Sequence, residues 1–148
     1  MFDVSSVMSS ELVTVSPSSS LSQARTLMSQ RGIRHLPAVD DAGGLVGLLT
    51  MTDVLAASDS MLRDRENRSI TDSLPVEDAM VTVLDTVPPG GSLRQAALYL
   101  ERHKIGCLPV VDQGKLVGII TDTDFVGVAI NLLEQLESFE PESDDPEA

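Results

Sequence analysis

The second half of the chain repeats the first half at an almost constant offset, and this internal repeat is the feature that most limits how the chain can fold. The matching segments are 20–24 with 92–96 and 36–40 with 108–112, which share one offset, and 45–50 with 116–121, where the offset is shorter by one residue. The missing residue falls between the last two segments of the second copy. A turn tolerates such a deletion, whereas a strand would lose its register. The chain is therefore predicted to contain two copies of one fold.

Each copy carries the same local signals. Ser20 with Gln23, and Ser92 with Gln95, fit the capping box that opens a helix. Two short apolar runs follow in each copy, and a Gly-containing turn separates them, which predicts a β-hairpin. The predicted order in each copy is therefore short strand, helix, strand, strand, helix.

This order defines a mixed α/β (α+β) fold, with the last helix of each copy beginning near Thr52 and near Thr123. Copies of about 60 residues would be marginal alone, so we expect their sheets to pack together and share a core. We assign the first copy to residues 1–57 and the second to 74–132. A linker at 58–73 joins them, and an acidic C-terminal tail occupies 133–148.

Charge is concentrated at the C-terminal end. The formal net charge is −13, and every charged residue after Asn131 is acidic. Together with Pro141 and Pro146, this run predicts that the tail is disordered. The linker instead contains Arg63, Arg65 and Arg68. These arginines fit either a solvated linker or a group that helps to hold a phosphate or a partner.

Composition argues against several classes of protein. The acidic balance disfavours DNA or RNA as a partner, because binding phosphates requires a basic face. No apolar run approaches the ~20 residues that span a bilayer, and the first residues lack a basic leader, so we expect a cytoplasmic protein without a membrane partner. Cys107 is the only cysteine, which excludes an internal disulfide and disfavours a zinc site. Its apolar neighbours favour a buried, inert thiol.

Two further patterns occur once in each copy. Residues 47–53 and 118–124 read Gly-Leu-Leu-Thr-Met-Thr-Asp and Gly-Ile-Ile-Thr-Asp-Thr-Asp, while 33–40 and 105–112 both end in Leu-Pro, a small apolar residue, Val and Asp. These segments resemble the signatures of a tandem CBS domain, the domain named after cystathionine beta-synthase, in its stand-alone bacterial or archaeal type. The resemblance covers about residues 4–130. It implies two repeats packed sheet to sheet with pseudo-twofold symmetry, and two such modules commonly form a dimer.

Asp53 and Asp124 end the segments 47–53 and 118–124, where a predicted strand ends and a predicted helix begins. A carboxylate there can accept hydrogen bonds from both hydroxyls of a ribose, because its two oxygens are acceptors only. Thr50 and Thr121 offer hydroxyls three residues earlier, and the helix N-terminus favours a nearby phosphate. Asp and Thr are also ordinary helix caps that bind nothing. We expect a ribose role for at least one of the two sites.

The resemblance also implies where the rest of an adenine nucleotide would bind. The adenine is expected between the backbone near residues 14–15 and the strand at 33–37, or between their counterparts in the second copy. The implied contacts are Thr14, Val15, Leu36 and Pro37, with Thr86, Val87, Leu108 and Pro109. Arg34 and His35 are the phosphate candidates, although they also fit an ordinary exposed pair on an edge strand. The second copy has Gly106 and Cys107 at these positions, so the two sites should not be equal.

The residues favour regulation over catalysis. The two histidines occupy non-equivalent positions of the repeat, and no catalytic cluster, metal-ligand spacing or phosphate-binding loop accompanies them. We therefore predict no catalytic residue, metal or catalytic cofactor, and a sensor that binds AMP, ADP or ATP in energy sensing. The alternatives are a ligand-free dimerisation or docking module for an unidentified protein partner, using apolar residues such as Leu132, Leu133 and Leu136, or a protein that binds S-adenosylmethionine or NAD.

Overall fold

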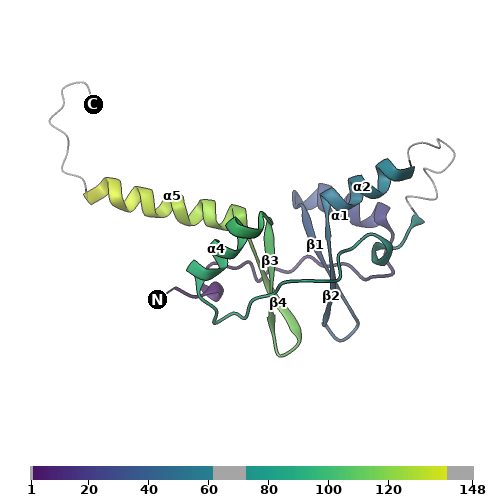
Figure 1. The fold of residues 1–148 in the computed structure, drawn as a ribbon, viewed down its shortest axis with the longest axis horizontal. Coiled ribbons are helices and arrows are strands. Elements are labelled where there is room, and N and C mark those ends of the chain that lie inside the picture. Colours follow the sequence, from purple (N-terminus) through teal and green to yellow (C-terminus); the bar gives the residue numbers. More distant parts are fainter. Residues whose placement is uncertain (1, 62–72, 140–148) are drawn as a thin grey trace, which may run out of the picture.

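The computed structural model describes residues 2–61 and 73–139, in which one arrangement of helices and strands occurs twice (Figure 1). The first copy contains η1 (Val4–Ser6), α1 (Leu21–Arg31), β1 (His35–Val39), β2 (Leu45–Thr50) and α2 (Met51–Met61). The second contains η3 (Val76–Asp78), α4 (Leu93–His103), β3 (Cys107–Asp112), β4 (Lys115–Thr121) and α5 (Asp122–Phe139). The linker arginines at positions 63, 65 and 68 lie outside the described residues, as does 140–148.

The first long helix of each copy begins at the predicted serine. In α1 the Ser20 hydroxyl accepts a hydrogen bond from the Gln23 N–H, and the Gln23 side chain accepts one from the Ser20 N–H, which completes the capping box. In α4 the Ser92 hydroxyl accepts from the Gln95 N–H. Within the described residues, the Gln95 side chain does not accept a hydrogen bond from the Ser92 N–H in return. The capping box is thus confirmed in full for the first copy and in half for the second.

The two predicted hairpins are also present. β1 pairs with β2, and β3 with β4, in antiparallel register. The second hairpin turns at Gln113 and Gly114, both with positive φ, as the type I′ form of a two-residue turn requires. The first hairpin has a longer turn, in which the Asp40 carboxylate accepts from the N–H groups of Ala42 and Gly44. The residue missing from the second copy is therefore lost from a turn.

The predicted first strand of each copy shrinks to a single bridge. Val15 pairs in parallel with Ala38 of β1, and Val87 pairs in the same way with Val110 of β3. Val15 donates its N–H to the Pro37 carbonyl oxygen at 3.0 Å. The hairpins stand side by side with the helices on the outer flanks (Figure 1).

The first segment of each copy packs against the other copy. Val4 of η1 is fully buried in the core around α4, β3 and β4, and Val76 of η3 is fully buried in the core around α1, β1 and β2. Backbone hydrogen bonds also join the first segment of each copy to the other copy: Ser9 pairs with Ile119 of β4, and Val81 pairs with Leu48 of β2. The two copies therefore share their cores by crossing over.

The glycine of each repeated signature makes room for this crossing. A Cβ at Gly47 would collide with the side chain of Met80, and a Cβ at Gly118 would collide with that of Met8. Met80 and Met8 belong to the crossing segments, so each signature glycine is the position at which a segment from the other copy rests on the hairpin.

α5 corrects the predicted extent of the tail. The helix continues to Phe139, so residues 133–139, which the sequence analysis assigns to a disordered tail, are helical. Apolar residues continue along this stretch at helical spacing, which favours helix despite the neighbouring acids. Within the residues described, no helix combines the length and apolar character needed to cross a membrane.

Candidate ligand-binding clefts between the two copies

A threonine and an aspartate join each hairpin to its following helix. In the first copy the N–H and the hydroxyl of Thr50 both donate to Asp53 Oδ2, at 2.9 and 2.8 Å, and Thr50 Oγ1 accepts from the Asp53 N–H at 3.1 Å. In the second copy Thr121 and Asp124 make the same three bonds, at 2.8, 3.2 and 3.4 Å. The capping role that the sequence suggested is therefore present at both sites.

Capping occupies only one oxygen of each carboxylate. All the bonds received by Asp53 and Asp124 end on Oδ2, and no hydrogen bond from the described residues reaches either Oδ1. The free oxygen can accept from a hydroxyl outside the chain, because an ionised carboxylate has acceptor capacity on both oxygens. Capping and ligand binding are therefore compatible in the same residue.

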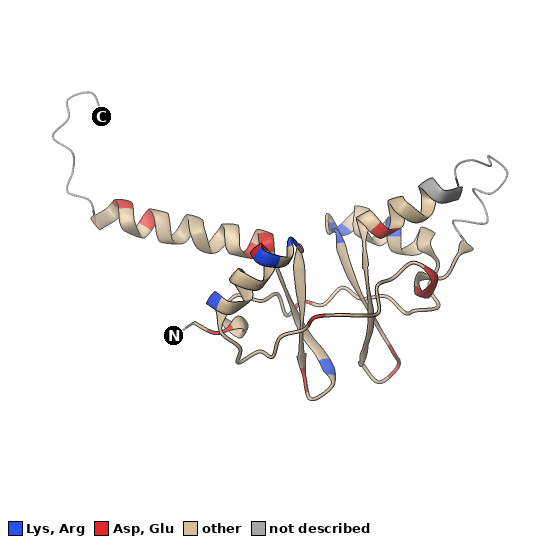
Figure 2. Cartoon of the chain, in the orientation of Figure 1, with Lys and Arg blue, Asp and Glu red and all other residues tan. Residues whose placement is uncertain are grey.

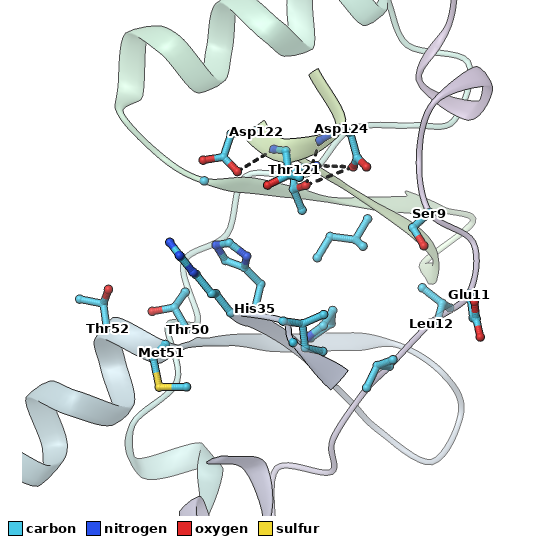
Figure 3. A pocket seen from close by; sticks show the side chains of 18 residues that line it. Ser9, Glu11, Leu12, His35, Thr50, Met51, Thr52, Thr121, Asp122 and Asp124 are labelled. Carbon is cyan, nitrogen blue, oxygen red and sulfur yellow. Dashed lines mark hydrogen bonds between the residues drawn. The ribbon is translucent and has the colours of Figure 1, made fainter. Parts of the chain in front are cut away.

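A cleft of about 710 Å³ opens beside Asp124. We call it the Asp124 cleft. Figure 3 shows Asp122 and Asp124 on one side of it and His35 and Thr50 on the other. Its lining comes from the crossing segment, the end of α1 with β1, and the start of both second helices: Ser9, Glu11, Leu12, Val13, Gly32, Ile33, Arg34, His35, Pro37, Thr50, Met51, Thr52, Gly106, Ile119, Thr121, Asp122, Thr123 and Asp124.

The two predicted basic residues lie in the same cleft as the aspartate of the other copy. Arg34 and His35 come from the first copy, whereas Thr121 and Asp124 come from the second. The sequence could not pair the basic residues with either aspartate. The pairing follows from the crossing, because the segment that precedes α1 runs along β4 before it returns to β1.

His35 reaches across to the second copy. A Cβ at Gly106 would lie 2.9 Å from His35 Nε2, so the imidazole rests where any larger residue would place its side chain. Burial is the main cause that lowers the pKa of His35 below its usual value; the nearby charge of Asp122 acts in the opposite direction, and Arg34 adds to the lowering. The imidazole is therefore held mainly neutral near pH 7.

A second, smaller cleft of about 300 Å³ lies at the pseudo-equivalent position. Its lining is Leu48, Val81, Val83, Leu84, Asp85, Ile105, Cys107 and Pro109, together with His35, Thr50, Thr52 and Gly106, which line both clefts. No arginine or lysine occurs among these described residues. Cys107 is buried, as predicted, and burial together with Asp122 raises the pKa of its thiol to about 12. The two clefts are therefore chemically unequal.

Several residues expected to bind a ligand do not line either cleft. Leu36 and Leu108 are buried in the two cores, with relative exposures of 0% and 1%. The side chains of neighbouring strand residues point to opposite faces, so His35 and Pro37 can face a cleft only if Leu36 faces the core. The others outside both clefts are Thr14, Val15, Asp53, Thr86 and Val87. The Val15 N–H donates directly to the Pro37 carbonyl oxygen, so these two backbone groups are paired with each other.

The cleft also contains residues that the sequence analysis missed. Ser9, Glu11 and Leu12 belong to the segment that crosses to β4, and Asp122 and Thr123 lie between Thr121 and Asp124 in the repeated segment 118–124. Met8 and Met80 are separated by the same offset as the other repeated segments. This match places the segment before α1 within the repeat, and it was the sequence signal that could have drawn attention to that segment. No local pattern indicated that this segment lies against the other copy.

Comparison with known proteins agrees with this architecture. The family model for the CBS domain matches residues 4–60 and 76–131. The CBS domain-containing protein YhcV of Bacillus subtilis is 34% identical over 120 residues, which cover 81% of this chain and 80% of that protein. The chain spans only 21% of another relative, an inosine-5'-monophosphate dehydrogenase of Korarchaeum cryptofilum.

Solved structures show the same fold. A putative acetoin utilization protein (AcuB) from Vibrio cholerae has a TM-score of 0.82 and 41% identity, covering 95% of this chain and 99% of that one. CBSX2 in complex with AMP has a TM-score of 0.77 and 32% identity, covering 90% and 99%. The CBS domain pair of protein MJ0100, in complex with 5'-methylthioadenosine and S-adenosyl-L-methionine, has a TM-score of 0.74 and 26% identity, covering 86% and 99%. With both repeats matched, the chain belongs to the CBS domain family.

Proposed function

We propose that this protein is a non-catalytic regulatory module that acts in the cytoplasm and binds an adenine nucleotide between its two CBS repeats. The observation that carries the proposal is the Asp124 cleft. It combines a carboxylate with one uncommitted oxygen, the neighbouring Thr121 hydroxyl, and the cationic Arg34. A ribose and an attached anionic group need these groups together.

The relatives support an adenosine ligand. CBSX2 binds AMP, and the MJ0100 pair binds 5'-methylthioadenosine and S-adenosyl-L-methionine. These ligands share adenosine and differ in what is attached to it. Since a ligand shifts a conformational equilibrium only by binding two states with different affinity, regulation by this module requires two arrangements of the repeats or of a dimer.

The test is a calorimetric titration of AMP, ADP, ATP, S-adenosylmethionine and NAD into the wild type and Asp124→Asn. The amide oxygen of Asn can still accept from Thr121 and preserve the cap, while the free Oδ1 is replaced by a donor that cannot accept from a ribose hydroxyl. We expect the affinity of the preferred ligand to fall by ~10–100-fold, the equivalent of losing a hydrogen bond to a charged group.

Asp53→Asn is the matched control. It makes the same change at the pseudo-equivalent position, outside the lining of both clefts. We expect it to leave the affinity within about threefold of the wild type, which is the scale of ~0.65 kcal/mol. Wild-type protein that binds none of the five compounds would refute the proposal.

We further propose that the module forms a homodimer through the outer face of α5. The exposed apolar side chains there are Val126, Ile130, Leu132, Leu133 and Leu136. Leu55 of α2 occupies the repeat position of Val126 and is also exposed. A second protein chain would cover α2 and α5 together, because the two chains of a twofold dimer present the same pair of helices to each other. The exposed face also favours a second candidate function, a docking module whose assembly does not depend on nucleotide.

A further inference from the structure

The Asp124 cleft carries more acidic than basic residues. Among the described residues that line it, Arg34 is the sole arginine or lysine, whereas Glu11, Asp122 and Asp124 are acidic. Figure 2 shows the acidic start of α5 in red. Sites that bind a polyphosphate gather cations or metal ions against its charge. The described lining therefore offers a polyphosphate little cationic compensation.

Asp122 lies beside the groups that would hold the anionic part of the ligand. A Cβ at Gly106 would lie 2.9 Å from His35 Nε2 and 3.8 Å from Asp122 Oδ2, so both side chains converge over Gly106. The Thr123 N–H donates to Asp122 Oδ1 at 2.8 Å, and no hydrogen bond from the described residues reaches Oδ2. In Figure 3 the Asp122 carboxylate and the His35 ring face each other across the cleft.

The charge of Asp122 acts on the groups around it. It contributes to the raised pKa of Cys107, and it opposes the lowering of the pKa of His35 by burial. Since His35 is held mainly neutral, it supplies a hydrogen bond but little positive charge. Among the described residues that line the cleft, Arg34 then carries the full positive charge, and the carboxylate of Asp122 lies nearby.

We propose, on the basis of the proposed function, that the Asp124 cleft selects adenosine compounds with at most one phosphate, and that Asp122 is the residue that disfavours ADP and ATP. Each added phosphate brings negative charge close to the unpaired Asp122 oxygen, and like charges placed together reduce affinity for the wrong ligand. Asp122 lines this cleft and is absent from the described lining of the smaller one, so the discrimination belongs to the Asp124 cleft.

The experiment titrates AMP, ADP and ATP into the full chain without divalent cations, and measures displacement of bound AMP by ATP to confirm competition for one cleft. The variants are Asp122→Asn and, as a matched control, Asp41→Asn. Asn at 122 can still accept from the Thr123 N–H. Asp41 is an exposed carboxylate in the β1–β2 turn, outside the lining of both clefts, so its loss changes the net charge equally.

In the wild type we expect AMP to bind at least ~10-fold more tightly than ATP, with ADP between them, a ratio equivalent to about 1.4 kcal/mol. Asp122→Asn should bring the ratio close to one by improving ATP binding, and Asp41→Asn should leave it unchanged. Wild-type protein that binds ATP as tightly as AMP would overturn the inference while leaving the proposed function intact. A ratio unaffected by Asp122→Asn would also overturn it. Binding of none of the three nucleotides would also overturn the inference, and the proposed function is contradicted with it if S-adenosylmethionine and NAD fail to bind as well.

Discussion

His35 shows how one side chain acquires its properties from the other half of the molecule. Its own neighbours in sequence are Arg34 and Leu36, but its ring rests on Gly106 of the second copy. Burial lowers its pKa, partly opposed by Asp122 and Asp53 and assisted by Arg34. The folded chain therefore favours the neutral imidazole more strongly than the unfolded chain does.

This preference makes stability depend on pH. Because the folded pKa of His35 lies below the unfolded value of about 6.5, its contribution is present above that pH and is lost as the pH falls through the window below it. We expect the urea midpoint of the wild type to fall between about pH 7.5 and about pH 5.5. The fall should be smaller in His35→Gln.

His103→Gln is the control, since the other histidine lies exposed at the end of α4. It should retain the wild-type fall, because it keeps His35. The carboxylates that also titrate at low pH are common to all three proteins, so they do not affect the comparison. An equal dependence in His35→Gln and wild type would show that the buried imidazole does not control this range.

The helices α1 and α4 begin with the same residues but not with the same bonds. Ser20 and Gln23 cap each other, whereas Ser92 caps α4 without a return bond from Gln95 within the described residues. Sequence alone could not separate the two cases, because both contain serine three residues before glutamine. The structure shows that Gln23 bonds back to the start of its helix, whereas Gln95, at the same position of α4, has no such bond among the described residues.

We expect Gln23→Ala to lower the free energy of unfolding by about 1 kcal/mol relative to Gln95→Ala, because only the first change removes a hydrogen bond to the backbone. Ser20→Ala and Ser92→Ala should each cost about 1 kcal/mol, since both serines cap a helix. Urea unfolding followed by circular dichroism measures all four. Equal losses for the two glutamine variants would mean that the Gln23 bond contributes nothing measurable.

The exchanged first segments make the whole molecule a single unit built from two sequence repeats. Val4 completes the core around α4, and Val76 completes the core around α1. α5 instead extends beyond the body with none of its residues buried (Figure 1). Its apolar face is exposed in the single chain, and the proposed homodimer would cover it.

Sedimentation velocity tests the proposed dimer. The wild type is expected to sediment as a dimer at micromolar concentration, and the double variant Leu133→Glu, Leu136→Glu as a monomer, because paired charges cannot be buried on a self-complementary apolar face. Gln135→Glu is the control: it adds an acid to the polar side of the same helix and should leave the dimer intact. The double variant should keep the helical content of the wild type, which shows that it still folds. A wild-type protein that sediments as a monomer would exclude this interface.

The sequence by itself determined the local parts of this protein. The two serine caps, the two hairpins and the Thr–Asp pairs at the starts of α2 and α5 all depend on residues within a few positions of one another, where backbone geometry and hydrogen bonding are set. The repeat then indicated that these parts occur twice. Cys107 was predictable as a buried thiol for the same reason, since its immediate neighbours are apolar.

The tertiary structure decided which parts meet. It placed Arg34 and His35 beside Asp124, brought Glu11 and Asp122 to the same cleft, and directed Leu36 into the core. These outcomes follow from the crossing of each copy's first segment to the other copy's sheet. That crossing depends on packing between residues far apart in the chain, such as Met8 on Gly118, and no pattern of neighbouring residues encodes such a contact.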